Sequence, residues 1–149
     1  MIDIFLAAKY VSQRYRMSFR YSLDEMKLHK LLYFAQRESF VMFGHPMFDS
    51  QFEAWKYGPV MRCLRGHSWD TDENLQTACP EISYYIPVFD KVFELYATKR
   101  SWTLSSVSHG ESCWQKAKDR ETGFTPVEIL TDDIRLDADA IKLRRLLCS

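Results

Sequence analysis

His109 and Cys113 are the residues whose types and spacing come closest to a catalytic pair. They lie four positions apart, so on a continuous helix the imidazole and the thiol would share one face, as a cysteine nucleophile and its base require. Gly110 falls between them and interrupts a helix, no third residue is identifiable that would orient the imidazole, and Trp114 alongside indicates packing. The pair is therefore interpreted as packed or capping residues, and the sequence predicts no catalytic residue and no enzyme.

Cys63 and His67 repeat this spacing and could supply half of a zinc site together with His45 or Cys79. Structural zinc sites normally use two closely spaced ligand pairs, whereas this sequence has one imperfect pair, separated by Gly66. Glycine-rich phosphate loops and the short motifs of metalloproteases and serine hydrolases do not occur in the sequence. We therefore expect neither a metal nor a cofactor.

A stretch near the N-terminus combines basic and aromatic side chains, as do surfaces that bind nucleic acid through phosphates and stacking. Its members are Lys9, Arg14, Arg16 and Arg20 with Tyr10, Tyr15, Phe19 and Tyr21. The chain as a whole carries 20 basic and 20 acidic residues, so it lacks a global positive field. A solvated helix face with its connector is the favoured interpretation, and DNA contact through Arg14, Arg16 and Arg20 stays an alternative.

Length and composition predict one domain over residues 1–149. The chain has 149 residues, of which 46% are hydrophobic, enough for a single sizeable core. Its first ten residues include Asp3, and their apolar run is too short for a signal peptide or a membrane span. Its 4 cysteines are widely scattered, as in reduced proteins. These features favour a cytoplasmic protein without membrane contact.

The elements that must position these residues begin with an amphipathic helix over residues 2–15. Ile4, Ala8, Val11 and Tyr15 recur on one face of it at helical spacing. Residues 16–21 are expected to form a connector. Ser22 and Glu25 then have the pattern of a capping box, which predicts the start of a second helix.

The second helix, residues 26–43, is the most strongly periodic segment and is expected to be the central one. Its stripe consists of Leu28, Leu31, Leu32 and Ala35, with Phe34 and Val41 beside it. Gly44 supplies the stop. A helix apolar over that much of its circumference leaves mainly Lys30 and Arg37 for water, and such a helix usually lies in the middle of a bundle.

The stretch EAWKYGPV, residues 53–60, breaks the helical rhythm. Side chains alternate there, with Trp55 and Tyr57 on one face and Phe52 and Ala54 on the other, which predicts a short extended segment. Gly58 is expected to cap, and Pro59 to begin, a short helix ending at residue 65. Trp55 and Tyr57 fit two interpretations, anchors of the core or residues of a partner-binding surface.

Beyond this stretch, residues 66–83 show no period, and their polar, proline-interrupted composition predicts a loop. Pro87 is expected to begin a helix whose core face carries Phe89, Val92, Phe93 and Tyr96. Two short helices, the first over residues 103–108, are expected to meet at Gly110.

The C-terminal part combines an ambiguous segment with a clear helix. Residues 127–130 suit either a strand or a helical turn. In the final helix one face is lined by Leu136, Ala140, Leu143 and Leu147, and the acids near its start and bases near its end match the helix dipole. The sequence thus predicts a mainly α, single compact helical domain with at most short β pieces near residues 52–57 and 127–130.

Three segments, in this order, match a known family pattern. They are MKLHKLLYFAQ at residues 26–36, FDSQFEAWKYGPV at residues 48–60 and LSSVSHGESCWQKA at residues 104–117. The chain resembles the Panacea domain family, which includes SocA-like antitoxins and GepA-type phage-associated proteins. The middle segment is the most specific of the three. Ser108 and Cys113 depart from the family pattern, which commonly has Thr and Pro there.

The resemblance implies a mainly helical, non-enzymatic bacterial or prophage protein that neutralises a cognate protein toxin by direct binding. One branch of the family looks like a proteolytic adaptor that delivers its toxin to an ATP-dependent protease. The family pattern supplies the candidate partner-binding residues, Lys27, Tyr33, Glu53, Trp55, Tyr57, Gly58, Pro59, His109 and Trp114. The main alternative is a DNA-binding autoregulator of its own operon, which would use the basic stretch from Arg14 to Tyr21.

Overall fold

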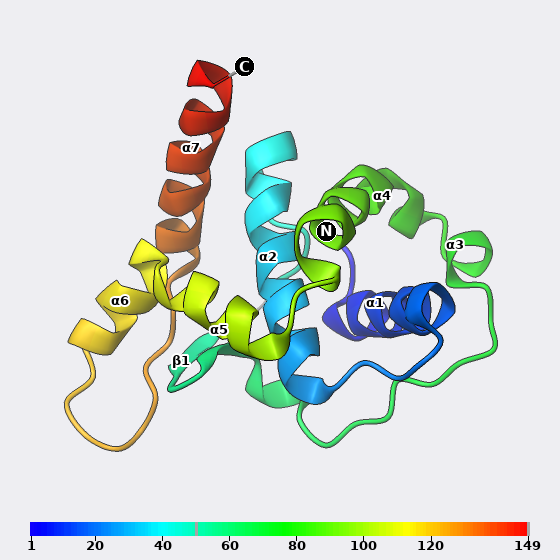
Figure 1. Ribbon diagram of the computed structural model, residues 1–149, viewed down its shortest axis with the longest axis horizontal. Helices are drawn as coiled ribbons and strands as arrows, with labels where there is room; N and C mark the ends of the chain where they lie inside the picture. Colours follow the sequence, from blue (N-terminus) through cyan, green and yellow to red (C-terminus); the bar gives the residue numbers. More distant parts are fainter. Residues whose placement is uncertain (50, 149) are drawn as a thin grey trace.

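The computed structural model describes residues 1–49 and 51–148, and it is mainly helical, as expected. In chain order its elements are α1 (Ile4–Phe19), α2 (Glu25–Phe43), β1 (Glu53–Trp55), β2 (Gly58–Val60), the 3-10 turn η1 (Arg62–Leu64), α3 (Leu75–Ala78), α4 (Glu81–Val92), the π-helix η2 (Phe93–Ala97), α5 (Ser101–His109), α6 (Ser112–Asp119) and α7 (Thr131–Leu147). Figure 1 shows α2 in the middle, with α1 and α4 on one side of it and α5, α6 and α7 on the other.

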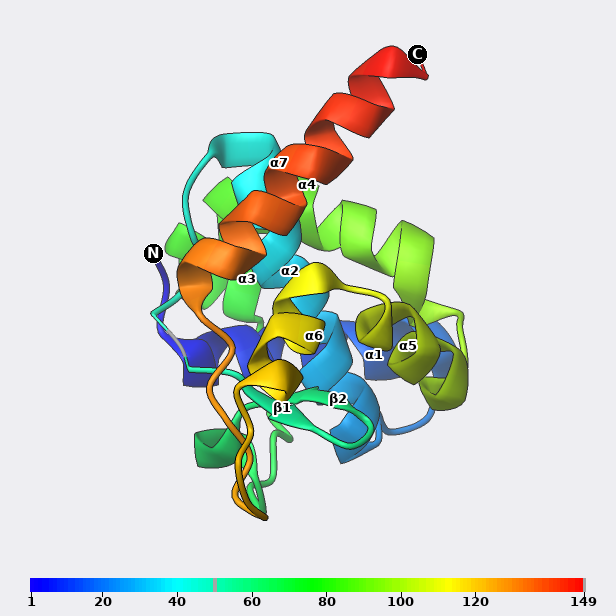
Figure 2. The same cartoon turned by 90° about the vertical axis from the view of Figure 1, so that its left-hand side faces the viewer.

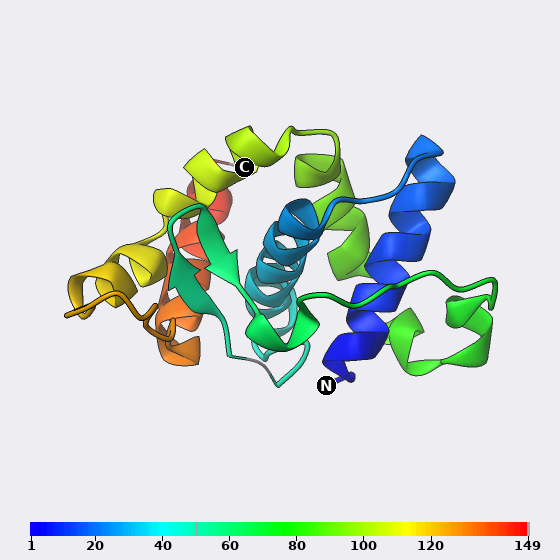
Figure 3. The same cartoon turned by 90° about the horizontal axis from the view of Figure 1, so that it is seen from below.

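Helix α2 is central because it is covered on nearly every side. Helices α1, α4, α5 and α7 and strand β2 all contact it, and Figure 3 shows the hairpin and α1 on opposite sides of it. Gly44 ends the helix in the left-handed region, with φ of 75°, as expected. The expectation that Lys30 and Arg37 face water is wrong, since both are buried. The periodic pattern identified the apolar stripe but not the elements that cover the opposite side.

The beginning of the chain differs from the expectation at two helix ends. Helix α1 continues to Phe19, so most of the expected connector is helical, and Arg20 ends it in the left-handed region with φ of 62°. The cap of α2 is Asp24, whose carboxylate accepts a hydrogen bond from the Lys27 amide at 2.9 Å, rather than Ser22. Asp, like Ser, favours this position because a short side-chain acceptor reaches the unsatisfied amides of the first turn.

The motif stretch forms an antiparallel hairpin in which Glu53 pairs with Val60 and Trp55 with Gly58. The extended segment is confirmed, but the helix expected from Pro59 to residue 65 is replaced by strand β2 and the turn η1. Residues 127–129 lie along the other edge of β1, where the Ile129 amide donates to the Phe52 carbonyl at 2.7 Å. This edge contact confirms the extended interpretation of residues 127–130. Phe52 and Ala54 are buried beneath the hairpin, as the alternation predicts.

Helix α4 begins at Glu81, six residues before the expected start at Pro87, which lies inside it. An internal proline removes one helix hydrogen bond. The turns before it are nevertheless anchored by the buried side chains of Ile82 and Tyr85. Together with α3, these turns make part of the expected loop over residues 66–83 helical. Three residues of the predicted core face, Phe89, Val92 and Tyr96, are buried, whereas the fourth, Phe93, is only half-buried.

Gly110 separates α5 from α6, as expected. Helix α7 begins at Thr131, so the acids of its first turn are Asp132 and Asp133 and not the expected Asp137 and Asp139. Helix α7 contacts α2 and α6 through a face that contains Ile134, Asp137 and Ala138. The apolar face made of Leu136, Ala140, Leu143 and Leu147 is exposed and turned away from α2. Figure 2 shows the C-terminal turns of α7 extending past the rest of the molecule.

Candidate partner-binding site

Gly58 brings the hairpin into close contact with α2 and α5. Its φ of 117° is rarely adopted by residues with a side chain, and a Cβ atom there would come within 2.5 Å of Ser108 Oγ and 3.0 Å of Lys30 Cε. Glycine is therefore required at this position both by the backbone conformation and by space. The contact fixes the hairpin so that its turn, Lys56 and Tyr57, projects from the domain.

Trp55 is half-buried at the edge of this hairpin and is held from both sides. Its indole N–H donates to Glu53 Oε1 at 2.9 Å, and its backbone carbonyl accepts from the Trp114 indole at 3.1 Å. The guanidinium groups of Arg62 and Arg65 lie 5.6 Å and 4.8 Å from its ring centre, within the range of cation–π attraction. These contacts fix the orientation of Trp55 while leaving part of its ring accessible.

A hollow of about 280 Å³ lies between this hairpin and the first turns of α2, and we call it the hairpin pocket. Its lining consists of Glu25, Met26, His29, Trp55, Lys56, Tyr57, Val60 and Arg65. Met26 is 41% exposed and Tyr57 is 45% exposed, although both are large apolar or aromatic side chains. The volume and lining suit one large apolar side chain of a partner, with basic groups at the rim.

His29 forms the inner wall of the hairpin pocket and ties α2 to the segment after β2. Its Nδ1 accepts a hydrogen bond from the Met61 amide at 3.1 Å, which places the ring proton on Nε2. Nε2 lies 3.7 Å from a carboxylate oxygen of Glu25. Burial lowers the pKa of His29, so the ring is neutral and structural at physiological pH.

The family described as antitoxin SocA-like, Panacea domain, matches residues 28–115. This is more than half of the chain. The chain belongs to this family. The matched range covers α2, the hairpin, α4 and α5, while α1 and α7 lie outside it. No curated protein and no solved structure matches the chain at a significant level. Among residues 1–49 and 51–148, no helix is both long and apolar enough to cross a membrane.

Membership of this antitoxin family supports a general antitoxin role and a protein partner. The resemblance noted from the three sequence segments is thus confirmed, and the most specific segment is the hairpin that lines the pocket. Of the family-pattern residues, Trp55 and Tyr57 are the two whose aromatic side chains line the hairpin pocket. Pro59 is buried in β2 directly behind it.

Lys27 and Tyr33 of the Panacea pattern lie inside the domain. The Lys27 ammonium donates to the Tyr15 hydroxyl at 3.1 Å, and burial lowers its pKa. The Tyr33 hydroxyl lies 3.0 Å from the sulfur of Cys113, and burial raises the pKa of both groups. These contacts join α2 to α1 and to α6, so both pattern residues stabilise the core.

His109 and Trp114 stack on each other beneath the hairpin, with ring centres 4.3 Å apart. Burial lowers the pKa of His109. Cys113 points instead to Tyr33, and its amide donates to Asp137 at 2.8 Å. The arrangement therefore agrees with packed residues and does not form a thiolate–imidazole pair, since the buried thiol is held protonated.

A buried ionic network, missed by the sequence reasoning, joins the Panacea core to α7. Arg37 contacts Glu111, Glu38 and the Tyr96 hydroxyl, and its side chain stacks over Phe34. Arg145 of α7 binds Glu38 through two hydrogen bonds of 2.8 Å and 2.6 Å. No sequence signal marks these partners, because they come from three separate helices, α2, η2 and α7, and from the turn before α6. Burial of such charges is tolerated only when each is paired.

The basic-aromatic stretch is largely neutralised by contacts within the chain. Arg14 pairs with Asp90 at 2.7 Å, and Arg16 pairs with Asp70 at 3.1 Å. Arg20 is exposed at the end of α1. The structure therefore does not bring Arg14, Arg16 and Arg20 together as an unpaired basic surface, which weakens the DNA-binding alternative.

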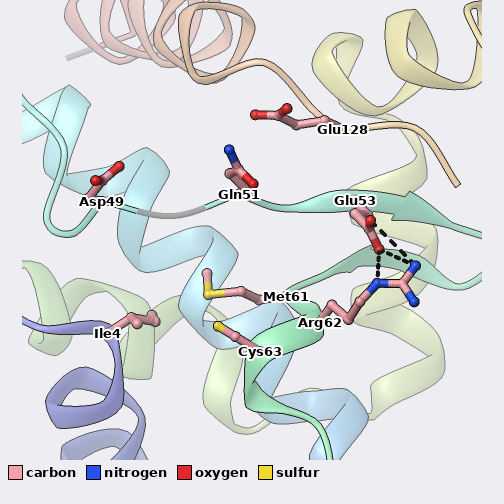
Figure 4. Close-up of a pocket in the computed structure, with 8 residues that line it drawn as sticks. All are labelled: Ile4, Asp49, Gln51, Glu53, Met61, Arg62, Cys63 and Glu128. Carbon is pink, nitrogen blue, oxygen red and sulfur yellow. Dashed lines mark hydrogen bonds and ion pairs between the residues drawn. The ribbon is translucent and has the colours of Figure 1, made fainter.

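A larger hollow, about 600 Å³, lies beside the base of the hairpin and was not predicted. Figure 4 shows Asp49, Glu128 and Glu53 along one side of it and Ile4, Met61, Arg62 and Cys63 along the other. Glu53 is turned toward Arg62, with a closest approach of 3.0 Å. Three carboxylates and one guanidinium line this hollow, so it is an acidic surface groove. Among residues 1–49 and 51–148 no group of side chains that could hold a metal ion is found.

Proposed function

We propose that this Panacea domain neutralises a cognate protein toxin by direct binding, and that the hairpin pocket is the centre of the contact. The observation that carries the proposal is the position of the family's most specific segment. Its aromatic residues Trp55 and Tyr57 line an accessible hollow, whereas Lys27 and Tyr33 of the same pattern are buried. Tryptophan and tyrosine in such positions are the residue types that most often dominate binding energy.

The proposed mechanism is stoichiometric masking. A toxin side chain enters between Met26 and Tyr57, and the rim groups Lys56 and Arg65 attract carboxylates beside it. A stable complex requires roughly 1,200 to 2,000 Å² of buried surface, so neighbouring faces contribute as well. The proposal requires no catalytic residue in this chain. Delivery of the bound toxin to an ATP-dependent protease is the finer possibility that the family suggests.

The test begins with the reading frames adjacent to this gene. We expect one of them to be lethal when expressed alone and tolerated when this chain is expressed with it, and the two purified proteins to form a complex. If no adjacent frame is toxic, or if rescue occurs without a complex, the proposal is wrong. A toxin level that stays constant during rescue indicates masking, and a level that falls only in cells with the protease indicates the adaptor route.

Variants of the hairpin then locate the contact. Tyr57→Ala removes a side chain that is 45% exposed, so we expect an unchanged fold and toxin binding at least about tenfold weaker. Trp102→Ala is the matched control, because Trp102 is 73% exposed on α5 and does not line the pocket. Equal binding by both variants and the original chain would place the toxin elsewhere on the domain.

A further inference from the structure

The outward face of α7 carries an apolar seam that the described part of the chain leaves uncovered. Leu136 is 47% exposed, Leu143 is 58% exposed and Leu147 is 76% exposed, with Ala140 exposed between them. The spacing of these four residues is four, three and four, the a/d repeat of two packed helices. Ordinary surface helices bury such a face against their own domain.

Helix α7 turns its leucine face outward because polar contacts hold the opposite face on the domain. Arg145 binds the buried Glu38, and Asp137 accepts from the Cys113 amide. On a helix of 3.6 residues per turn, Ile134, Ala138 and Arg145 lie opposite Leu136 and Leu143. The leucines therefore cannot turn inward without breaking the Arg145–Glu38 pair.

The charges beside the seam are segregated along α7. The first half carries the exposed carboxylates of Asp132 and Asp139 and one exposed cation between them, Arg135, which contacts both and leaves this half net negative. The second half carries the exposed cations of Lys142 and Arg144. Two copies of this helix placed antiparallel bring each acidic half beside a basic half, and their dipoles also oppose. A parallel pair would place the acidic first turns beside each other.

We propose that the outward face of α7 binds the same face of a second copy of this chain, forming an antiparallel helix pair. Leu136 of one copy then packs against Leu147 of the other, and Ala140 against Leu143, so that large and small residues alternate along the seam. The contact has the self-complementarity of a two-fold dimer. The two domains lie on opposite sides of the helix pair, because α2 covers the inner face of each α7.

The seam is short, so the dimer is expected to form with a dissociation constant on the order of 10 to 100 μM. Sedimentation equilibrium over a concentration series measures it directly, starting from a monomer of 17.7 kDa. Leu143→Glu replaces a buried leucine by a carboxylate in both copies of the dimer. We therefore expect at least about a hundredfold weaker association. Leu147→Glu, farther along the exposed face, is the second variant.

Met17→Glu is the matched control, because it adds the same charge to a side chain that is 74% exposed on α1. Circular dichroism verifies that each variant keeps the helical fold. If the chain stays monomeric at concentrations on the order of 1 mM, the proposal is wrong. It is then also wrong if Leu143→Glu weakens toxin binding, because that result would make the outward face of α7 a toxin contact. A dimer that tolerates both leucine variants places the contact on another face.

Spin labels at Cys148 test the orientation, with Cys63 and Cys79 replaced by serine and Cys113 left buried. In the antiparallel pair the labels are separated by about 13 residues along the helix axis, or roughly 20 Å. In a parallel pair this axial offset is absent, and the two Leu147 side chains would face each other across the seam. A disulfide that joins two copies of a Leu147→Cys variant, with Cys148 also replaced by serine, would therefore overturn the antiparallel arrangement.

Discussion

At the scale of single residues, the buried Lys30 is the least expected feature of the domain. Its ammonium nitrogen is buried without a hydrogen-bond partner among the described residues, and burial lowers its pKa to about 8. The folded chain therefore binds this proton less tightly than the unfolded chain does. Between pH 8 and the unfolded pKa the unfolded state holds more protons at this group, so the contribution of Lys30 to stability rises with pH in that window. The buried Cys113 thiol, whose pKa is raised, contributes with the opposite sign.

We expect Lys30→Met to stabilise the domain at pH 7 by up to about 3 kcal/mol, because methionine has no charge to desolvate. The difference in unfolding free energy between the variant and the original chain should shrink between pH 8 and 10, because the original chain loses the cost of its buried charge there. Urea unfolding at several pH values measures both effects. Lys9→Met, on the exposed face of α1, is the control and should leave the pH dependence as it is. Parallel pH curves for Lys30→Met and the original chain would contradict the burial argument.

Gly58 provides a second test at this scale. Gly58→Ala combines an unfavourable φ with a Cβ atom 2.5 Å from Ser108 Oγ, so we expect a loss of about 2 to 4 kcal/mol in unfolding free energy. Gly123→Ala is the matched control, since nothing lies within 4 Å of its added Cβ and its backbone is not left-handed. Removing the hydroxyl with Ser108→Ala in the same chain should recover part of the loss. Equal stability of the two alanine variants would show that the hairpin adjusts without cost.

At the scale of elements, an ion pair holds α7 on the domain together with the buried apolar side chains of Ile134 and Ala138. Arg145→Ala leaves the fully buried Glu38 with only the 3.5 Å contact to Arg37. We expect about 2 to 3 kcal/mol of destabilisation, below the full value for a buried pair because Arg145 is partly exposed. Protease cleavage within α7 should also become faster.

Arg135→Ala tests whether this effect is specific to the buried pair. Arg135 lies on the same helix and contacts the exposed Asp132 and Asp139, so its loss should change the unfolding free energy by less than about 0.5 kcal/mol. Similar destabilisation by both variants would mean that helix propensity, and not the contact with Glu38, controls α7.

Most elements could be predicted at this scale, and the errors share a cause. The apolar stripe and glycine stop of α2 were sufficient to identify it, because both are local properties of the sequence. The strand at Gly58–Val60 was mistaken for a helix start, since glycine followed by proline suits both positions. Hydrogen bonding to β1 makes this segment a strand, and the pattern of residues within the segment does not reveal that partner.

At the scale of the whole molecule, charge balance argues against general nucleic-acid binding. The 20 basic residues are matched by 20 acidic ones, and Arg14 and Arg16 are paired within the chain. We therefore expect the purified protein not to retard operator DNA in a gel shift, even at low salt, where phosphate contacts are strongest. A salt-dependent shift by the protein alone would favour the autoregulator alternative instead.

The two proposed surfaces lie on separate elements, so they can be tested independently. The hairpin pocket is formed by α2, the hairpin and the segment after it, whereas the proposed dimer seam lies on α7 outside the range matched by the family. We expect Leu143→Glu to leave toxin affinity within about twofold, and Tyr57→Ala to leave the dimer unchanged. A loss of both properties in either variant would indicate a shared interface.

The sequence by itself determined the central helix, the mainly α fold class and the family, because these depend on local periodicity and on the order of a few residues along the chain. Only the tertiary structure decided which charged residues are buried and which apolar residues are exposed. Lys30 and Arg37 are inside because α5, α7 and β2 cover the side of α2 that looked solvated. Leu136, Leu143 and Leu147 are outside because Arg145 and Asp137 hold the opposite face of α7 on the domain. Burial depends on which distant elements meet, and helical spacing does not contain that information.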